Sequence, residues 1–520
     1  MTISLTQGLH RSVQQTSRST ATVSGRRRQD FGTLGERVAR LAGALRRAGM
    51  AQGDRVAMLA LNSDRYLEYY LATMWGGGVV NPCNIRWSPA EIAHSLDDCE
   101  TRLLIVDDEF TPMLPELRRR SRCLATVVHV GEGTPPPGAA SYEALLAASE
   151  PVGDAHRQGD DMAGIFYTGG TTGTPKGVVL SHGNIFASSL ALAAAVGCTA
   201  GTVYLHGAPM FHMADTAVSF AQVICGGSHV MIPRFTPDAA LRALQDEGVT
   251  ATLLVPLMIQ MLVDQPGRRG FDCSSLGTLL YGASPMSEPV LRRAMAAFPG
   301  AAFIHVYGMT ELSPLATLLP FAEHLHTGPL AGRLRAAGRA ALCAEVRIVG
   351  LDGREAPRGT VGEVAVRGPN VMLGYWNRPE LTAAAVRDGW MHTGDGAYMD
   401  DDGFIYVVDR LKDMIVTGGE NVYSAEVENA LMQHPSVSMC AVIAVPDAHW
   451  GERVHAVVVR REGTEASEQE VVAHCRSLIA GYKCPRSLEW RDSLPVSGAG
   501  KILKAALREP FWQGVRSKVN

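Results

Sequence analysis

The chain has 520 residues, of which 46% are hydrophobic and 19% are charged, a composition typical of folded globular proteins that excludes wholesale disorder. Its 48 basic and 52 acidic residues give a formal net charge of −4, so there is no basic excess to indicate a nucleic-acid partner. No apolar run approaches the roughly 18 residues of a membrane span. Ten dispersed cysteines without a CxxC pair predict reduced thiols and a cytoplasmic protein.

The first hundred residues predict short strands around one long helix. Thr20–Ser24 has β-type composition. Thr33-x-x-Glu36 has the pattern of a capping box, so we expect a helix to begin at Thr33 and to end near Gly49. Further strands are predicted at Val56–Leu61 and Leu103–Val106.

From about residue 160 to 400, apolar runs alternate with helical stretches, which predicts α/β layers. Here we expect strands at Ala251–Val255 and Leu279–Leu280 and a helix at Val290–Ala297. From about residue 340 the pattern becomes β-rich, with strands predicted at Glu345–Val349, Gly362–Arg367 and Gly403–Val408.

A smaller α+β unit is predicted after Asp409. We expect Ser424 to cap a helix that runs through Met432, followed by strands at Val437–Val445 and Arg453–Val459. The predicted organisation is therefore a large N-terminal domain over residues 1–409, made of α/β layers and a β-rich subdomain, with a small mobile α+β domain over 410–520.

Residues 167–177 read YTGGTTGTPKG and lie between two apolar runs, so we expect a loop that joins two strands. Glycines let its backbone approach a ligand closely, threonines add hydroxyl donors, and successive N–H groups can bind an anion. It is not a Walker A loop, because Pro175 precedes Lys176 and no GK[ST] follows. Only six of the 48 basic residues are lysines, which makes Lys176 a candidate for a specific role.

This loop resembles the signature of the adenylate-forming superfamily, which includes acyl-CoA synthetases, luciferases and nonribosomal-peptide adenylation domains. Gly170 stands where the usual form has serine. Four further strings resemble family motifs and follow in family order: YGMTE at 307–311, TGD at 393–395, DRLKD at 409–413 and PVSGAGK ending at Lys501.

The resemblance implies an ATP-dependent, AMP-forming carboxylic acid–CoA ligase, with ATP, Mg²⁺ and coenzyme A as cofactors and co-substrates. It implies that Thr168 and Glu311 bind Mg²⁺, that Lys501 bridges the carboxylate and the α-phosphate, and that Lys412 is the hinge. The phosphate-loop residues that it assigns to ATP are Thr168, Gly169, Gly170, Thr171, Thr172, Gly173, Thr174 and Lys176. Those that it assigns to the α-phosphate, adenine and ribose are Gly282, Ala283, Ser284, Tyr307, Gly308, Met309, Thr310, Asp395 and Arg410.

The coenzyme and acid sites are less specific in the sequence. Gly418 and Gly419 stand where relatives form a channel for the pantetheine arm, and Arg234 where they place a basic residue near the CoA nucleotide. His212 in PMFH is expected to border the acid pocket, although a core role also fits it. Thr216 replaces the tryptophan gate of long-chain relatives, which leaves a medium-chain fatty acid, an aryl acid or a short thioether acid open.

Three alternatives to a CoA ligase remain at this point: an acyl-AMP ligase that loads a carrier protein, a luciferase-like oxygenating enzyme, and a non-catalytic binding protein with the same fold. The presence of both Lys501 and Glu311 argues against a non-catalytic binding protein, because such a protein needs neither the catalytic lysine nor the magnesium-binding acid. The oligomeric state is left open, with a homodimer as one expectation.

Overall fold

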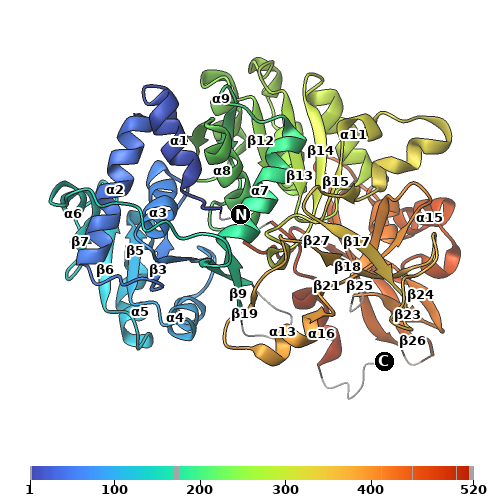
Figure 1. Cartoon of the computed structure of the whole chain (residues 1–520). Helices are drawn as coiled ribbons and strands as arrows, with labels where there is room; N and C mark the ends of the chain where they lie inside the picture. Colours follow the sequence, from blue (N-terminus) through green and yellow to red (C-terminus); the bar gives the residue numbers. More distant parts are fainter. Residues whose placement is uncertain (1–2, 169–174, 411–412, 448, 499, 514–520) are drawn as a thin grey trace.

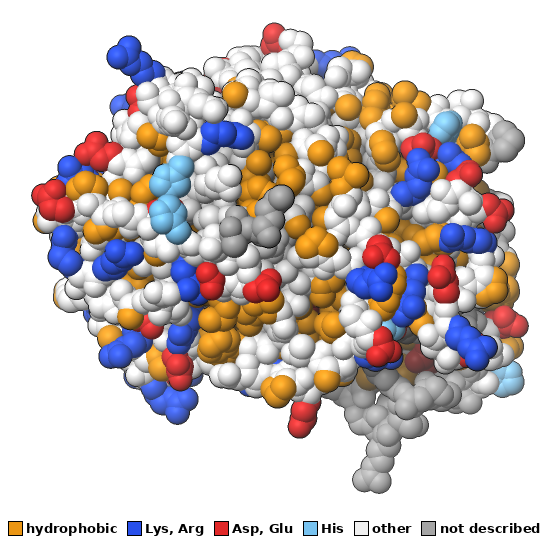
Figure 2. All heavy atoms as spheres, in the orientation of Figure 1, with side chains coloured by type: hydrophobic (Ala, Val, Ile, Leu, Met, Phe, Trp, Pro, Cys, Tyr) orange, Lys and Arg blue, Asp and Glu red, His pale blue; other side chains and the backbone are white. Residues whose placement is uncertain are grey.

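The computed structural model describes residues 3–168, 175–410, 413–447, 449–498 and 500–513 (Figure 1). It has a large N-terminal α/β domain and a small C-terminal domain, as the sequence predicts. None of the helices in these ranges is both long and apolar enough to cross a membrane. On the face drawn in Figure 2, acidic and basic side chains alternate with uncharged and hydrophobic ones.

Sheet A forms the middle of the large domain, and its inner strands β10 to β14 are parallel. Its strands, in spatial order, are β16 (Arg339–Ala340), β15 (Thr317–Leu319), β14 (Ala302–Tyr307), β13 (Thr278–Gly282), β12 (Ala251–Leu254), β10 (Val203–His206), β11 (Ser228–Met231), β1 (Thr20–Ser24) and β2 (Arg27–Asp30). Because β1 pairs with β11, the N-terminal segment is an integral part of this sheet.

Sheet B lies beside sheet A, and Figure 1 shows its strands β3, β5 and β6 on the side of the molecule away from the C-terminal domain. Its strands, in spatial order, are β19 (Gly374–Tyr375), β9 (Lys176–Ser181), β8 (Met162–Thr168), β4 (Val79–Pro82), β3 (Arg55–Leu59), β5 (Leu103–Asp107), β6 (Thr126–Val130) and β7 (Ala140–Ser141). The antiparallel pair β8–β9 confirms that the phosphate loop joins two strands.

Two smaller sheets follow in the chain. Sheet C comprises β17 (Glu345–Val349), β18 (Gly362–Arg367), β21 (Trp390–Met399), β20 (Val386–Arg387) and β22 (Ile405–Arg410). Sheet D belongs to the C-terminal domain and comprises β24 (Glu420–Val422), β23 (Ile415–Thr417), β26 (Gly451–Arg460), β25 (Val437–Asp447) and β27 (Ser487–Arg491).

Helices cover the sheets. Those before the phosphate loop are α1 (Gln7–Thr16), α2 (Phe31–Arg47), α3 (Asp64–Trp75), α4 (Pro89–Asp98), α5 (Leu114–Arg120) and α6 (Tyr142–Ala147). After it come α7 (His182–Val196), α8 (Met213–Cys225), α9 (Pro237–Asp246), α10 (Pro256–Asp264), α11 (Glu288–Ala297), α12 (Phe321–His324) and α13 (Pro379–Ala385). The C-terminal domain contains α14 (Ser424–Leu431), α15 (Glu468–Leu478) and α16 (Lys504–Trp512).

Two predicted helix caps are wrong. The residue that caps α2 is Asp30, whose carboxylate accepts a hydrogen bond from the backbone N–H of Thr33, so the helix begins at Phe31. Asp caps helices at least as well as Thr, and a cap at Asp30 starts the helix one residue later, before Thr33 is reached. In α14, Tyr423 occupies the cap position without a side-chain bond, and Ser424 is the first helical residue.

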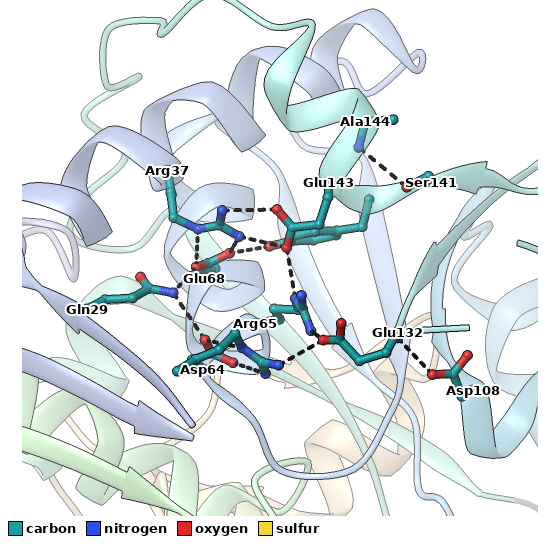
Figure 3. Close-up of polar contacts among 12 residues, drawn as sticks. Gln29, Arg37, Asp64, Arg65, Glu68, Asp108, Glu132, Ser141, Glu143 and Ala144 are labelled. Atoms are coloured by element: carbon teal, nitrogen blue, oxygen red, sulfur yellow. Dashed lines mark hydrogen bonds and ion pairs between the residues drawn. The ribbon is translucent and has the colours of Figure 1, made fainter. Parts of the chain in front are cut away.

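A buried ion network joins α2, α3 and α6 (Figure 3). Glu68 on α3 is fully buried and accepts hydrogen bonds from Arg37 (2.7 Å), Gln29 (2.9 Å) and Tyr142 (2.6 Å). Arg37 also bonds Glu143 at 3.0 Å. Burial acts to lower the pKa of Arg37, but the hydrogen bonds to the two glutamates outweigh it and the pKa is raised. The network therefore surrounds the buried Glu68 carboxylate with hydrogen-bond donors from three side chains.

We expect Arg37→Ala to destabilise the N-terminal domain by about 3 kcal/mol, because it leaves the buried Glu68 carboxylate without its cation. The urea midpoint of the N-terminal unfolding transition measures the loss. Arg242→Ala is the control, because Arg242 forms an exposed pair with Asp238 on α9 and its removal should leave the urea midpoint close to the wild-type value. Equal losses in the two variants would show that the network does not stabilise the domain.

Candidate active site

The carboxyl ends of β13 and β14 form one wall of the candidate site. The strands are parallel and adjacent, with Gly282 opposite Val306, so Ala283 and Tyr307 leave the sheet at the same edge, where open α/β sheets bind ligands. Ala283 has a left-handed backbone with φ of 64°, and it is exposed, as a lining residue requires. A Cβ at Gly308 would clash with the carbonyl of Pro314, so this turn needs glycine.

Tyr307 connects this edge to sheet C. Its hydroxyl donates to Asp395 Oδ2 at 2.8 Å, and Arg410 Nε lies 3.0 Å from Asp395 Oδ1. Burial and the neighbouring Asp395 carboxylate raise the pKa of Tyr307, which keeps its hydroxyl a donor. The structure thus brings together three residues that the sequence assigned to adenine and ribose, from three separate motifs.

The β8–β9 hairpin supplies the second wall. Thr168 ends β8 and stands directly opposite Lys176, the first residue of β9. The rest of the predicted phosphate loop, residues 169–174, lies outside the described part of the chain, and so does the predicted hinge Lys412.

Glu311 lies in the short turn after β14 and is buried. Its Oε1 accepts a 2.8 Å hydrogen bond from the Tyr375 hydroxyl, and Lys176 Nζ lies 5.1 Å from the centre of the Tyr375 ring. Burial raises the pKa of Glu311, while Tyr375, Arg410 and Lys176 oppose that shift. A buried carboxylate that faces cations fits a hard divalent ion, because Mg²⁺ prefers carboxylate oxygen.

Tyr375 is the functional candidate that the sequence analysis missed. It lies on β19, which pairs with β9, so sheet formation carries it from a distant segment to the phosphate hairpin. A two-residue strand has no periodicity to reveal it, and no chemical motif marks this tyrosine.

The Lys501 loop of the C-terminal domain docks on the N-terminal domain. Arg86 Nη1 donates to the carbonyl of Ser497 at 2.7 Å, and a Cβ at Gly498 would lie 2.7 Å from Asn84 Oδ1. The same loop passes Val255, the residue after β12, and a Cβ at Gly500 would lie 3.0 Å from Val255 Cγ2. The glycines therefore let the loop backbone lie close to side chains of the N-terminal domain.

The Lys501 amine lies within electrostatic reach of Arg410 and Asp395. Burial and the Arg410 cation lower the pKa of Lys501 to about 8, against the opposing effect of Asp395 and Asp413. A half-buried amine among these groups favours an anionic partner, which would restore its positive charge. The charges that act on the Lys501 amine therefore include those of two residues predicted to bind the nucleotide.

His212 caps α8 and accepts a long 3.4 Å hydrogen bond from the Ala214 N–H. Burial lowers the pKa of His212, so the ring is neutral near pH 7. Thr216 is fully buried, and its hydroxyl contacts Tyr70 (3.0 Å) and the carbonyls of Met210 and His212. Thr216 thus belongs to the packing of α8, and His212 stays a predicted pocket residue.

The residues predicted to bind coenzyme A make contacts with other residues than those of the candidate nucleotide site. Gly418 and Gly419 form the β23–β24 turn, where the Gly418 N–H donates to the carbonyl of Trp450 at 2.9 Å. Arg234 forms an exposed ion pair with Glu109 at 2.7 Å. Ser284, Met309 and Thr310 lie half-buried beside the wall formed by β13 and β14.

Two family models, curated relatives and a solved structure are similar to this chain. The family model described as AMP-binding enzyme matches residues 9–376, and the model described as AMP-binding enzyme C-terminal domain matches residues 426–501. A feruloyl-CoA synthase from Amycolatopsis sp is 40% identical over 96% of this chain and 98% of that protein. The fatty acid–[acyl-carrier-protein] ligase ScoC from Streptomyces coeruleorubidus is 37% identical over 92% of this chain and 91% of that protein. The crystal structure of ATP-bound MatB from Rhodopseudomonas palustris has a TM-score of 0.88 and 30% identity, covering 99% of this chain and 100% of that one.

Proposed function

The chain belongs to the AMP-binding enzyme family and is an AMP-forming ligase, and on that premise we propose that it joins an aryl carboxylic acid to coenzyme A. The observation that best supports the ligase chemistry is the Asp395–Arg410 ion pair, whose charges also act on the Lys501 amine although the three residues come from separate motifs.

The reaction has two steps. In the first, a carboxylate oxygen of the acid attacks the α-phosphorus of ATP, a P–O bond breaks and pyrophosphate leaves. In the second, the CoA thiol loses its proton and attacks the acyl carbon, and AMP leaves. Neither step needs a protein nucleophile, so the protein acts by positioning and by neutralising charge on oxygens.

The residues divide this work. The protonated Lys501 amine bridges the two anions that react, the acid carboxylate and the α-phosphate. Thr168 and Lys176 hold the β and γ phosphates from the hairpin. Asp395 accepts hydrogen bonds from the ribose hydroxyls, for which its oxygens keep free lone pairs beside those used by Tyr307 and Arg410.

Mg²⁺ fits the oxygen donors of Glu311 and Thr168, which are proposed to hold it. When bound, it neutralises charge on the phosphate oxygens. The Tyr375 hydroxyl fixes Oε1 of Glu311 and so orients the carboxylate.

Two positions of the small domain are proposed for the two steps. The docked Lys501 loop supports the first step, in which the amine enters the nucleotide site. Gly418 donates its N–H to the Trp450 carbonyl in this arrangement, and we propose that a rotation about residue 412 brings the turn of Gly418 and Gly419 toward the acyl group. A domain boundary at 409/410 is part of this proposal.

The relatives support an aryl acid as the first substrate candidate, because a 40% identical protein is a feruloyl-CoA synthase. Medium-chain fatty acids are the second candidate. Scoring ferulate, benzoates and C2–C18 fatty acids by pyrophosphate release, with and without CoA, tests both. Highest kcat/KM for an aryl acid supports the proposal, and a clear preference for any aliphatic acid would contradict it.

Loading of a carrier protein is the alternative, favoured by the 37% identity with a fatty acid–carrier-protein ligase. The two functions differ in the acyl acceptor. Thioester yield from free CoA and from a phosphopantetheinyl carrier protein at equal concentration distinguishes them.

Adenylation is expected to lose activity as the pH rises through about 8. Lys501 acts in its charged form, which dominates below its pKa, so kcat/KM for ATP should fall up to tenfold per pH unit above that value. Thioester formation from supplied acyl-AMP should show no such fall. An adenylation rate that stays level to about pH 10 would show that the mechanism does not need the positive charge of Lys501.

All ten cysteines are free thiols, which supports a reducing compartment, and we propose the cytoplasm. A homodimer is proposed only as a state to be tested by light scattering.

A further inference from the structure

A cluster of two imidazoles and one carboxylate lies on the surface of the N-terminal domain. His10 is on α1, and Asp154 and His156 are on the segment between α6 and β8, which Figure 1 shows running across the molecule toward β9. His10 Nε2 lies 2.8 Å and His156 Nδ1 lies 3.9 Å from Asp154 Oδ2. The three ligand atoms all lie within 4.8 Å of one another.

The carboxylate of this cluster is fixed before any ligand arrives. Only 1% of the Asp154 side chain is exposed, although both imidazoles are accessible, at 42% for His10 and 74% for His156. The Thr6 hydroxyl donates to Asp154 Oδ2 at 2.6 Å, and the His156 N–H donates to Oδ1 at 2.8 Å. A buried acid thus presents one oxygen to the two rings.

The imidazole rings are held as well. His10 stacks on Trp75, with ring centroids 4.4 Å apart, and the Trp75 indole N–H donates to the Val152 carbonyl at 2.8 Å. His156 adopts a left-handed backbone with φ of 52°, which is uncommon for a residue other than glycine. In this conformation its Nδ1 lies 3.9 Å from Asp154 Oδ2, and its ring centroid lies 5.9 Å from that of His10.

We propose that His10, Asp154 and His156 bind a divalent transition-metal ion of the Zn²⁺ type. Two imidazole nitrogens and one carboxylate oxygen are a donor set that Zn²⁺ uses, with water in the remaining position. Metal–ligand bonds of about 2.0–2.2 Å require ligand atoms about 3.3–3.6 Å apart in a tetrahedral site, so the cluster needs only small side-chain rotations to enclose an ion.

The ion would link α1 to the segment that leads into β8. That link lies on residues apart from the nucleotide cluster, so it acts on the stability of the N-terminal domain rather than on the reaction. The inference stands independently of the proposed function.

The test is a titration of the untagged full-length protein with ZnCl₂ in a non-chelating buffer without nucleotide, followed by calorimetry and by the melting temperature. We expect one ion per chain and a rise in melting temperature, because the ion binds the folded state preferentially. His10→Ala and His156→Ala should each weaken binding roughly tenfold or more and abolish the rise in melting temperature.

His449→Ala is the matched control. His449 is exposed, packs on Trp450 with ring centroids 4.7 Å apart, and donates its N–H to Asp447 Oδ1 at 2.9 Å, so it repeats the local Asp-x-His arrangement. Among the residues that the structure describes, no second imidazole completes a cluster there. The control should bind like the wild type. Absence of saturable binding, or binding that survives both His10→Ala and His156→Ala in folded protein, would overturn the proposal.

Discussion

Replacing Lys501 with alanine is expected to slow acyl-adenylate formation by about 10²–10³-fold, while thioester formation from supplied acyl-AMP stays close to the wild-type rate. In the proposed mechanism the amine acts where two anions meet in the first step. Its loop docks beside Arg86 and Asn84, an arrangement that we propose serves that step. Single-turnover assays of each half-reaction measure the two rates separately.

Two variants control for charge and for folding. Lys483→Ala removes another lysine of the small domain, one that pairs with Glu426 at 2.8 Å away from the site, and should leave both half-reactions intact. Lys501→Arg keeps the charge on a planar group of different shape, so partial adenylation is expected. If Lys501→Ala slowed both half-reactions equally, the assignment of this lysine to the first step would be wrong.

Replacing Glu311 with glutamine should slow adenylation by about 10²-fold and raise the Mg²⁺ concentration needed for half-maximal rate. Glutamine keeps an oxygen that can accept the Tyr375 hydrogen bond, so the local packing survives while the negative charge is lost. Adenylation rates measured across a Mg²⁺ series show both effects.

Tyr375→Phe is the matched control for this second variant. It removes the hydrogen bond that orients Glu311 and leaves the carboxylate charge in place, so a loss of only a few-fold is expected. Undiminished Mg²⁺-dependent adenylation in Glu311→Gln would exclude the carboxylate as a metal ligand.

Elements with strong local patterns were predictable from the sequence. The strands at Glu345–Val349 and Gly362–Arg367 agree with the prediction to the residue, and the two strands around the phosphate loop form the expected hairpin. In both places an apolar run is bounded by turn residues, so local composition determines the strand.

Helix starts were less predictable where two residues compete for the same cap. Asp30 and Thr33 are both good caps, and only the folded backbone shows that Asp30 accepts the hydrogen bond. The stop predicted near Gly49 is confirmed, because the helix ends at Arg47, Ala48 is its C-cap and Gly49 follows with a φ of 103°, where glycine is favoured.

The motifs of the candidate site could be found in the sequence, but the hydrogen bonds and contacts that join distant segments there could not. Tyr307, Asp395 and Arg410 were assigned to one ligand from three strings, and their hydrogen bonds agree with that grouping. Tyr375 and Arg86 reach the site through strand pairing and domain docking. Such contacts join segments far apart in the chain, so no local pattern encodes them.

The most direct test of the account is acid-dependent exchange of labelled pyrophosphate into ATP, measured with the acid panel for the wild type and for Lys501→Ala. The account predicts exchange with at least one carboxylic acid, dependence on Mg²⁺, and a loss of about 10²-fold or more in the variant. Absence of exchange with every acid, or equal exchange in the two proteins, would contradict it.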